Sequence, residues 1–161
     1  MEYRIREIRP DELQLLDDFL YLAIFQPDDA EVLPREVIHT PEIYNYVQDF
    51  GRPDDLCLVA EINDAVVGAV WTRILAGDIP GYGNVDDSTP EFAVSVSEPY
   101  RQRGIGTELM RSMLNLLKQR GYAQASLSVQ KDNPATRLYQ RLGFKIVQER
   151  EEDYLMVHEL R

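Results

Sequence analysis

The chain has 161 residues, of which 44% are hydrophobic and 28% charged, a balance typical of one folded domain. No apolar run approaches the roughly 20 residues that span a bilayer, and the charged start MEYRIREIRPDE is unlike a signal peptide. One cysteine, Cys57, and two histidines exclude an intrachain disulfide and give no metal-ligand spacing. We therefore expect a single cytoplasmic domain over residues 1–161, without a membrane segment or a metal site.

The net charge of −11 disfavours nucleic acid and anionic membrane surfaces as partners. The charge is uneven: residues 1–99 hold 6 basic and 21 acidic groups, whereas residues 100–161 hold 11 basic and 7 acidic groups. The acidic half either keeps the protein soluble or attracts a cation. The basic excess in the second half suits an anion bound there.

The first half of the chain is predicted to contain three strands. Alternating polar and apolar residues indicate a strand over 3–8, and the Pro10-Asp11-Glu12 start predicts a helix that carries leucines at helical spacing up to Ile24. Residues 27–50 are interrupted by proline and are expected to form loops and short helical turns. Two apolar strands, 56–62 and 65–71, are joined at Asn63-Asp64, which is a typical hairpin turn. A loop rich in Gly, Pro and Asp follows over 77–90.

The second half alternates strands and helices. It is predicted to contain a strand over 91–97, a helix from Ile105 that ends at Gly121, and a strand over 123–129. A short helix capped by Asn133 ends at Gly143, and strands over 144–149 and 154–159 finish the chain. This order predicts a mixed α/β domain, a mostly antiparallel twisted sheet of six or seven strands flanked by about four helices.

A glycine-rich loop, Arg101-x-x-Gly104-x-Gly106, lies directly between a predicted strand and a predicted helix. Such a loop presents free backbone N–H groups and the positive end of a helix dipole, so it is suited to a phosphate. The competing interpretation is a tight turn with two solvated arginines. The spacing matches neither the GxGxxG dinucleotide motif nor a P-loop.

A second motif favours the phosphate-binding interpretation of the glycine loop. The run Asn133-Pro134-Ala135-Thr136-Arg137-Leu138-Tyr139-Gln140-Arg141-Leu142-Gly143-Phe144 follows a predicted strand and ends in Leu-Gly-Phe. The strand at 91–97, the glycine loop and this run together resemble the GNAT superfamily of acetyl-CoA-dependent N-acetyltransferases. The resemblance is close over about residues 90–146 and looser over the hairpin at 56–74. It does not extend to residues 27–55.

The resemblance implies that acetyl-CoA is the cosubstrate. The loop would wrap the coenzyme pyrophosphate, the strand before it would pair with the pantetheine arm through its backbone, and the asparagine of the second motif would touch the same arm. Here Asn133 lies six residues before the tyrosine, where many family members have seven. The implied coenzyme-binding residues are Val94, Ser95, Val96, Arg101, Gln102, Arg103, Gly104, Ile105, Gly106, Thr107 and Asn133.

The resemblance also implies the catalytic groups. Tyr139 would protonate the departing thiolate, because a phenol holds its proton at neutral pH; the alternative for this residue is core packing. Glu91 would be the general base, with Asp86 and Asp87 as loop alternatives and a solvated charge as the competing interpretation. Tyr44 and Tyr46 either line the acceptor site or pack a loop helix.

The implied reaction moves an acetyl group to the primary amine of a small molecule by direct attack in a ternary complex. The alternatives are a protein or peptide N-acetyltransferase and a non-catalytic module that senses acyl-CoA. The family is also compatible with a homodimer. Neither a nucleic acid nor a membrane is expected as a partner.

Overall fold

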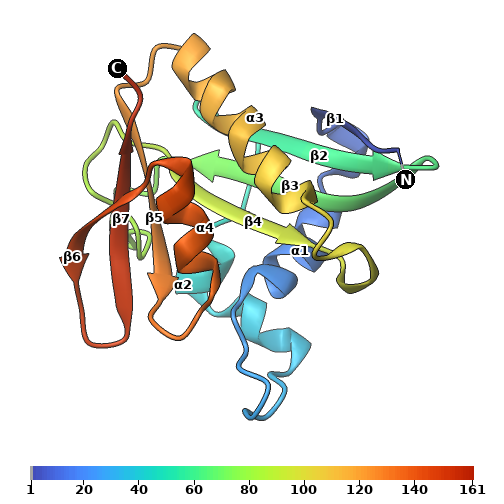
Figure 1. Cartoon of the computed structure of the whole chain (residues 1–161), viewed down its shortest axis with the longest axis horizontal. Coiled ribbons are helices and arrows are strands. Elements are labelled where there is room, and N and C mark those ends of the chain that lie inside the picture. Colours follow the sequence, from blue (N-terminus) through green and yellow to red (C-terminus); the bar gives the residue numbers. More distant parts are fainter. Residues whose placement is uncertain (1) are drawn as a thin grey trace.

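The computed structural model describes residues 2–161, so that Met1, part of the expected domain, lies outside the described residues. Seven strands form one sheet in the order β1-β2-β3-β4-β5-β7-β6 (Figure 1). The strands are β1 (Arg4–Glu7), β2 (Leu56–Ile62), β3 (Ala65–Arg73), β4 (Glu91–Val96), β5 (Gln124–Gln130), β6 (Lys145–Glu149) and β7 (Asp153–Glu159). The α-helices are α1 (Leu15–Ala23), α2 (Pro41–Tyr44), α3 (Ile105–Gln119) and α4 (Ala135–Leu142). The predicted mixed α/β fold with a mostly antiparallel sheet is confirmed.

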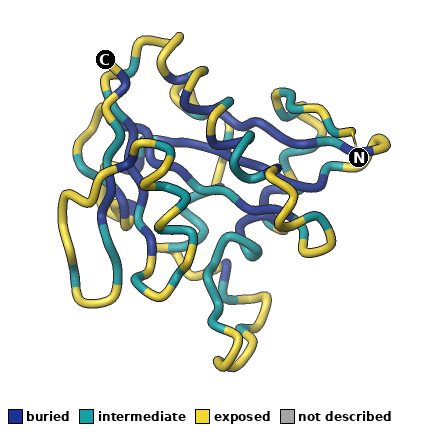
Figure 2. The backbone as a smooth tube through the Cα atoms, in the orientation of Figure 1, coloured by how far each residue is buried: buried dark blue, intermediate teal, exposed yellow. Residues whose placement is uncertain are grey.

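Helices cover both faces of the sheet, and the strands are therefore apolar on both sides. Leu56 and Leu58 of β2 pack in the core beneath α3, whereas Cys57 and Val59 belong to a second core beneath α1. Burial is deepest along β2 and β3, as Figure 2 shows. Because both faces of these strands are covered, they read in the sequence as continuous apolar runs.

The turn residues adopt the conformations that the sequence predicts. Asn63 and Asp64 both have positive φ, 49° and 66°, as a type I′ hairpin turn between β2 and β3 requires. Gly121 has φ +87° and follows α3, where the Tyr122 N–H donates to the Leu117 carbonyl in a Schellman motif. Gly143, with φ +109°, ends α4.

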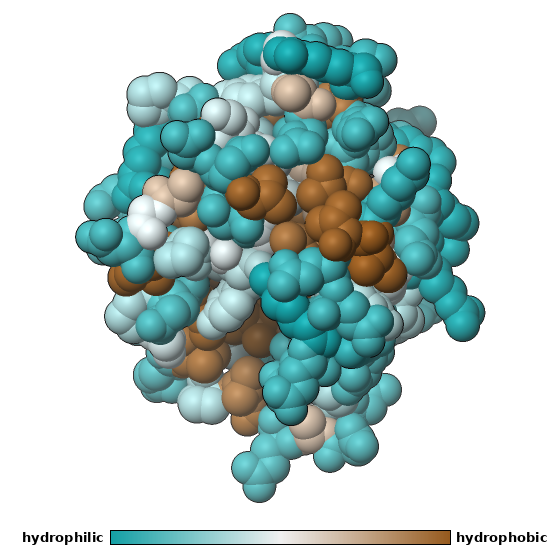
Figure 3. Space-filling view, turned by 90° about the vertical axis from the view of Figure 1, so that its left-hand side faces the viewer, coloured by the Kyte–Doolittle hydropathy of each residue, from teal (hydrophilic) through white to brown (hydrophobic). Residues whose placement is uncertain are grey.

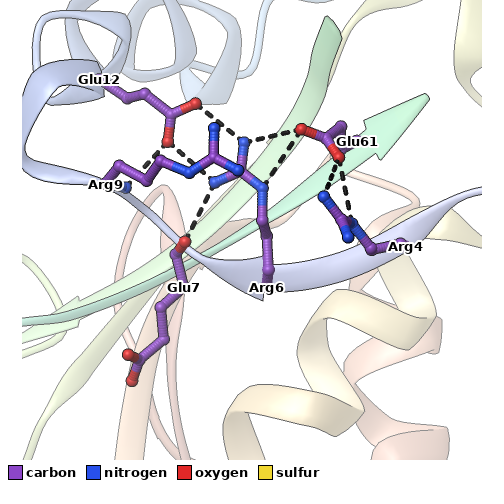
Figure 4. Close-up of polar contacts among 6 residues, drawn as sticks. All are labelled: Arg4, Arg6, Glu7, Arg9, Glu12 and Glu61. Atoms are coloured by element: carbon purple, nitrogen blue, oxygen red, sulfur yellow. Dashed lines mark hydrogen bonds and ion pairs between the residues drawn. The ribbon is translucent and has the colours of Figure 1, made fainter. Parts of the chain in front are cut away.

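The predicted helix at Pro10 is divided in two. A single 3-10 turn, Pro10–Glu12, precedes α1, and the Glu12 carboxylate of this turn accepts the Arg9 N–H at 2.8 Å. Arg6 joins Glu12 (2.9 Å) to Glu61 of β2 (3.0 Å), as Figure 4 shows. The hydrogen bonds from Arg6 lower the pKa of Glu12 to about 2. This ion-pair network therefore holds the 3-10 turn Pro10–Glu12 against β1 and β2 at neutral pH.

A buried arginine at the end of β3 holds the segment that follows α2. Arg73 is 1% exposed and donates to both carboxylate oxygens of Asp55, at 3.1 and 2.8 Å. Its Nη1 also donates to the carbonyls of Asn45 (2.9 Å) and Gln48 (2.7 Å), and the guanidinium lies over the Phe50 ring. Residues 45–55 are thus fixed against the sheet by one side chain.

The sheet has a free edge at β6. Every residue of β6 is exposed, and Ile146 and Val147 are large hydrophobic residues among them. Figure 3, seen from the side of β6 and β7, shows hydrophobic side chains gathered within a mostly hydrophilic surface. Within residues 2–161, no helix combines the length and apolarity needed to cross a membrane.

Candidate active site

The site is built where β4 and β5 separate. These two parallel strands are joined at one register pair, Glu91 with Ser126, and then diverge, as Figure 1 shows. On its other side β4 stays paired with β3 along its whole length. A gap therefore opens in the middle of the sheet, bordered by the free edge of β4.

The main-chain groups of Val94 and Val96 face this gap. The Ser97 N–H donates to the Val67 carbonyl of β3 at 2.8 Å. The main-chain N–H and C=O groups of the odd-numbered β4 residues therefore point toward β3, and those of the even-numbered residues point away from it. In agreement, the Val96 carbonyl accepts a hydrogen bond from Arg101 Nε at 2.8 Å. The N–H groups of Val94 and Val96 are therefore available to a ligand that lies along the gap.

Ser95 is placed differently from its two neighbours. Its main chain pairs with Ala69 on β3, and its buried hydroxyl donates to the Phe19 carbonyl of α1 at 2.7 Å. The side chain thus docks α1 on the sheet. Ser95 therefore does not face the gap, and Val94 and Val96 remain the predicted coenzyme contacts on β4.

The glycine loop leads from β4 into α3 with its backbone exposed. Gln102 and Gly104 have positive φ, 64° and 82°, and α3 begins at the buried Ile105. The first N–H groups of a helix have no partner within it, so the amides up to about Thr107 point at one place beyond the helix end. The structure thus brings loop amides and a helix N-terminus together, as a phosphate site requires.

Two arginines flank this loop without occupying its centre. Arg101 is held by the Val96 carbonyl, and the Arg103 guanidinium lies 5.8 Å from the Tyr100 ring centroid. A Cβ at Gly104 would meet nothing within 4 Å, and one at Gly106 would be 3.8 Å from Val96. The space around Gly104 is therefore open to a ligand.

A carboxylate at Gly104 is expected to repel the coenzyme phosphates. We expect the Gly104→Asp variant to bind acetyl-CoA at least about tenfold more weakly than Gly104→Asn, because both residues tolerate positive φ but only one is charged. Calorimetric titration of both variants checks this result. Equal affinities would place the phosphates away from this loop.

A cavity of about 700 Å³ passes through the gap. Phe92 and Val94 of β4 belong to the core under α3, whereas Ala93 packs with the α1 core, so alternate residues of the strand line opposite faces. Apolar residues form most of its walls, and the turn between β6 and β7 adds polar ones. Its lining includes Leu20, Ala23, Ile24, Phe25, Ile43, Tyr46, Tyr82, Glu91, Phe92, Ala93, Val94, Met110, Leu127, Ser128, Asn133, Tyr139, Arg150, Glu151, Glu152 and Asp153.

Glu91 is a buried carboxylate at the wall of this cavity, not a solvated charge. It is 2% exposed, and its Oε2 accepts hydrogen bonds from the Tyr46 hydroxyl and from the Gly83 N–H (3.0 Å). Burial raises the pKa of Glu91 to about 7, although these hydrogen bonds oppose the shift. Asp86 and Asp87 are exposed and are not among the residues that line the cavity. A carboxyl group poised near neutral pH can accept a proton at physiological pH.

Tyr139 lines the same cavity from α4. Its half-buried ring packs edge-on against Phe144, at 6.2 Å between centroids, and burial raises the pKa of its phenol to about 12. It therefore keeps its proton at neutral pH. The ring packs against the core and the residue also borders the cavity, so the two predicted roles are compatible.

Removing this hydroxyl tests its role as a proton donor. We expect Tyr139→Phe to lower kcat by at least about tenfold and to leave the Kd for acetyl-CoA nearly unchanged, because the ring that packs against Phe144 remains. Steady-state rates and calorimetry check the two parts. An unaltered kcat would remove Tyr139 from the reaction.

Asn133 caps α4 and also borders the cavity. Its Oδ1 accepts the Ala135 N–H at 2.9 Å, as predicted for a capping residue. Its side chain is half-buried beside the gap. A contact with the coenzyme stays a prediction.

The comparisons with known proteins agree with this geometry. The family model described as "Acetyltransferase (GNAT) family" matches residues 19–144. The chain belongs to the GNAT acetyltransferase family. A relative from Sulfurisphaera tokodaii, named N-alpha-acetyltransferase, is 29% identical over 91% of this chain and 82% of its own length.

Other relatives extend well beyond the matched region. Mycothiol acetyltransferase of Corynebacterium aurimucosum is 35% identical over 52% of this chain, which is 26% of that protein. Among solved structures, the PaiA N-acetyltransferase of Thermoplasma acidophilum, in complex with coenzyme A, has a TM-score of 0.69 at 18% identity and covers 99% of both chains. The chain thus shares the GNAT fold over 99% of its length. It spans about a quarter of the length of the mycothiol acetyltransferase.

Several residues of this GNAT site were missed by sequence reasoning. Gly81 and Gly83 belong to the loop at 77–90, yet both are buried beside Glu91. Arg150 approaches from the β6–β7 turn and donates to the Tyr82 carbonyl at 2.5 Å. The glycine-rich composition indicated a loop, and nothing local to it indicated which side chain it would cover.

Proposed function

We propose that this chain is an acetyl-CoA-dependent N-acetyltransferase that acetylates the primary amine of a small molecule. One observation carries the proposal: a single cavity passes between β4 and β5 and is bordered by both the buried Glu91 carboxylate and the Tyr139 phenol. Two groups suited to accept and to donate a proton thus line one space that reaches both faces of the sheet.

The coenzyme would lie on the side of α3 and α4. Its pyrophosphate would bind the amides between Gln102 and Thr107, and its pantetheine arm would follow the free edge of β4 at Val94 and Val96. An N–H of that edge would stabilise the oxyanion that forms when the thioester is attacked, a contribution of about 3–4 kcal/mol per donor.

The proton transfers follow from the two side chains. Glu91 would take a proton from the ammonium group of the acceptor, and the free amine would attack the thioester carbonyl. The tetrahedral intermediate would then break its bond to sulfur, and Tyr139 would protonate the thiolate. The second proton of the attacking nitrogen would return to the Tyr139 phenolate through solvent, and Glu91 would release its proton to solvent. The products are the acetylated amine and free coenzyme A.

The acceptor side of the cavity suits a small cationic amine. Glu151, Glu152 and Asp153 line it from the β6–β7 turn, and Arg150 is paired with Asp153 at 2.8 Å, so the acidic groups are in excess. Ile24 and Phe25, at the end of α1, supply an apolar wall. A volume of about 700 Å³ that also admits the acetyl group and part of the pantetheine arm leaves room for a small molecule.

A peptide N-terminus is the second candidate acceptor. The observation in its favour is the relative named N-alpha-acetyltransferase, which aligns over 91% of this chain. A terminal α-amine presents the same chemistry to Glu91 as a small amine does. The two acceptors differ in how much of the molecule lies outside the cavity.

Thiol release from acetyl-CoA, measured against matched acceptors, tests the proposal. We expect release with small primary amines and none with their N-acetylated forms. Release only with peptides that have a free N-terminus would establish the second candidate. Binding of acetyl-CoA without release for any acceptor would favour a sensor and contradict the proposed reaction.

A further inference from the structure

Tyr46 is fixed at both ends where it approaches Glu91. Its carbonyl accepts a hydrogen bond from Nε1 of the fully buried Trp71 at 3.0 Å. Its hydroxyl donates to Glu91 Oε2 and accepts the Tyr82 N–H at 2.9 Å. The main chain is therefore anchored to β3 while the hydroxyl is held between β4 and the loop at 77–90.

The Glu91 carboxylate is held asymmetrically. Oε2 has two donors, the Tyr46 hydroxyl and the Gly83 N–H. Oε1 is buried and, within residues 2–161, makes no hydrogen bond. The lone pairs of Oε1 are therefore the ones free to accept a proton. An unpaired buried oxygen costs free energy, and a role as proton acceptor accounts for its presence here.

The loop at 77–90, which supplies the Gly83 donor, fits closely around the carboxylate. A Cβ at Gly81 would lie 2.0 Å from Oε1, and one at Gly83 would lie 2.8 Å from the β5 backbone. Ser126 of β5 donates to the Gly83 carbonyl at 2.6 Å. These two glycines are thus required by space, since a side chain at either would displace the loop or Glu91.

We propose that Tyr46 is a positioning residue for the acetyl transfer: together with residues 81–83 it holds Glu91 by Oε2 and leaves Oε1 to take the proton. This inference rests on the proposed function, in which Glu91 is the general base. It gives Tyr46, which belongs to no sequence motif, a role in the reaction.

The Tyr46 hydroxyl also affects the pH at which Glu91 ionises. The groups that face Glu91 are Tyr46, the loop at Tyr82, and Arg150, which is paired with Asp153. The hydrogen bond from Tyr46 favours the carboxylate and lowers the pKa of Glu91 against the effect of burial. Loss of this hydrogen bond must therefore raise the pH at which Glu91 becomes an active base.

The Tyr46→Phe variant tests the proposal because it keeps the ring and removes the hydroxyl. We expect kcat/KM at pH 7 to fall at least about tenfold, the lower end of the effect of one hydrogen bond to a charged group, and the acid limb of the pH profile to move to higher pH. The Kd for acetyl-CoA stays the same. Tyr44→Phe, at the end of α2 and outside the cavity lining, is the matched control and should keep the wild-type kcat/KM and pH profile.

A second pair of variants tests the close fit of the loop. Gly81→Ala should lower kcat by at least about tenfold, because its Cβ must displace Oε1, whereas Gly77→Ala, with nothing within 4 Å of its Cβ, should not. A Tyr46→Phe variant with an unshifted acid limb, or a fully active Gly81→Ala variant, would overturn the inference. If Glu91→Gln itself stays active, the proposed role of Glu91 as the general base fails instead.

Discussion

We expect the Glu91→Gln variant to lose about 100-fold or more of kcat/KM for amine acetylation, the usual contribution of a general base. Glutamine keeps the shape of the side chain and can still accept hydrogen bonds from Tyr46 and Gly83, but it cannot take a proton. The wild-type rate should rise with pH through about 7, because only ionised Glu91 is active. Steady-state rates from pH 5 to 9 check both points.

The same variant should change stability in a direction that burial dictates. The folded-state pKa of Glu91, about 7, lies above the ordinary value of 4.5, so ionisation destabilises the folded state as pH rises from about 4.5 to 7. Glu91→Gln should therefore have a higher Tm than the wild type at pH 8 and an equal one at pH 4.

Asp87→Asn, an exposed change in the neighbouring loop, is the control for the activity prediction. Loss of activity in Asp87→Asn, with Glu91→Gln active, would move the general base to the loop.

Replacing Arg73 with leucine is expected to lower the free energy of unfolding by about 3–5 kcal/mol. The change leaves the Asp55 carboxylate, whose side chain is 3% exposed, without its cation. It also removes the donors to the carbonyls of Asn45 and Gln48. Unfolding in urea, followed by circular dichroism, measures the loss.

A matched change on the surface separates this effect from loss of charge alone. Arg52 lies in the same segment but is exposed, so Arg52→Leu should change the free energy of unfolding by less than about 0.5 kcal/mol. A loss below about 1 kcal/mol for Arg73→Leu would show that the buried pair contributes little. The segment after α2, and with it Tyr46, would then need another anchor.

Local patterns predicted most of the fold. The apolar runs at β2 and β3, the Asn63-Asp64 turn and the glycines that end α3 and α4 each act within a few residues, so periodicity and turn chemistry suffice. The glycine loop before α3 could be predicted for the same reason, because the pattern that suggests phosphate binding is contained in six consecutive residues.

The acid–base part of the site could be predicted only in outline. Tyr46 and Glu91 are 45 residues apart and meet because Arg73 and Trp71 hold the segment after α2 against β3. No local pattern encodes that contact. Ser95 illustrates a second limit. The strand that contains it was predicted correctly, but the main-chain groups of β4 that face the gap depend on how β4 pairs with β3, and the sequence does not give that register.

The initial rate of thiol release, with acetyl-CoA and the amine both varied, tests the central claim most directly. A single cavity that borders Glu91 and Tyr139 predicts direct transfer in a ternary complex, and burial raises the pKa of the Cys57 thiol, which makes it a poor nucleophile. We therefore expect double-reciprocal plots that intersect. Parallel lines would indicate an acetyl-enzyme intermediate and would contradict this account.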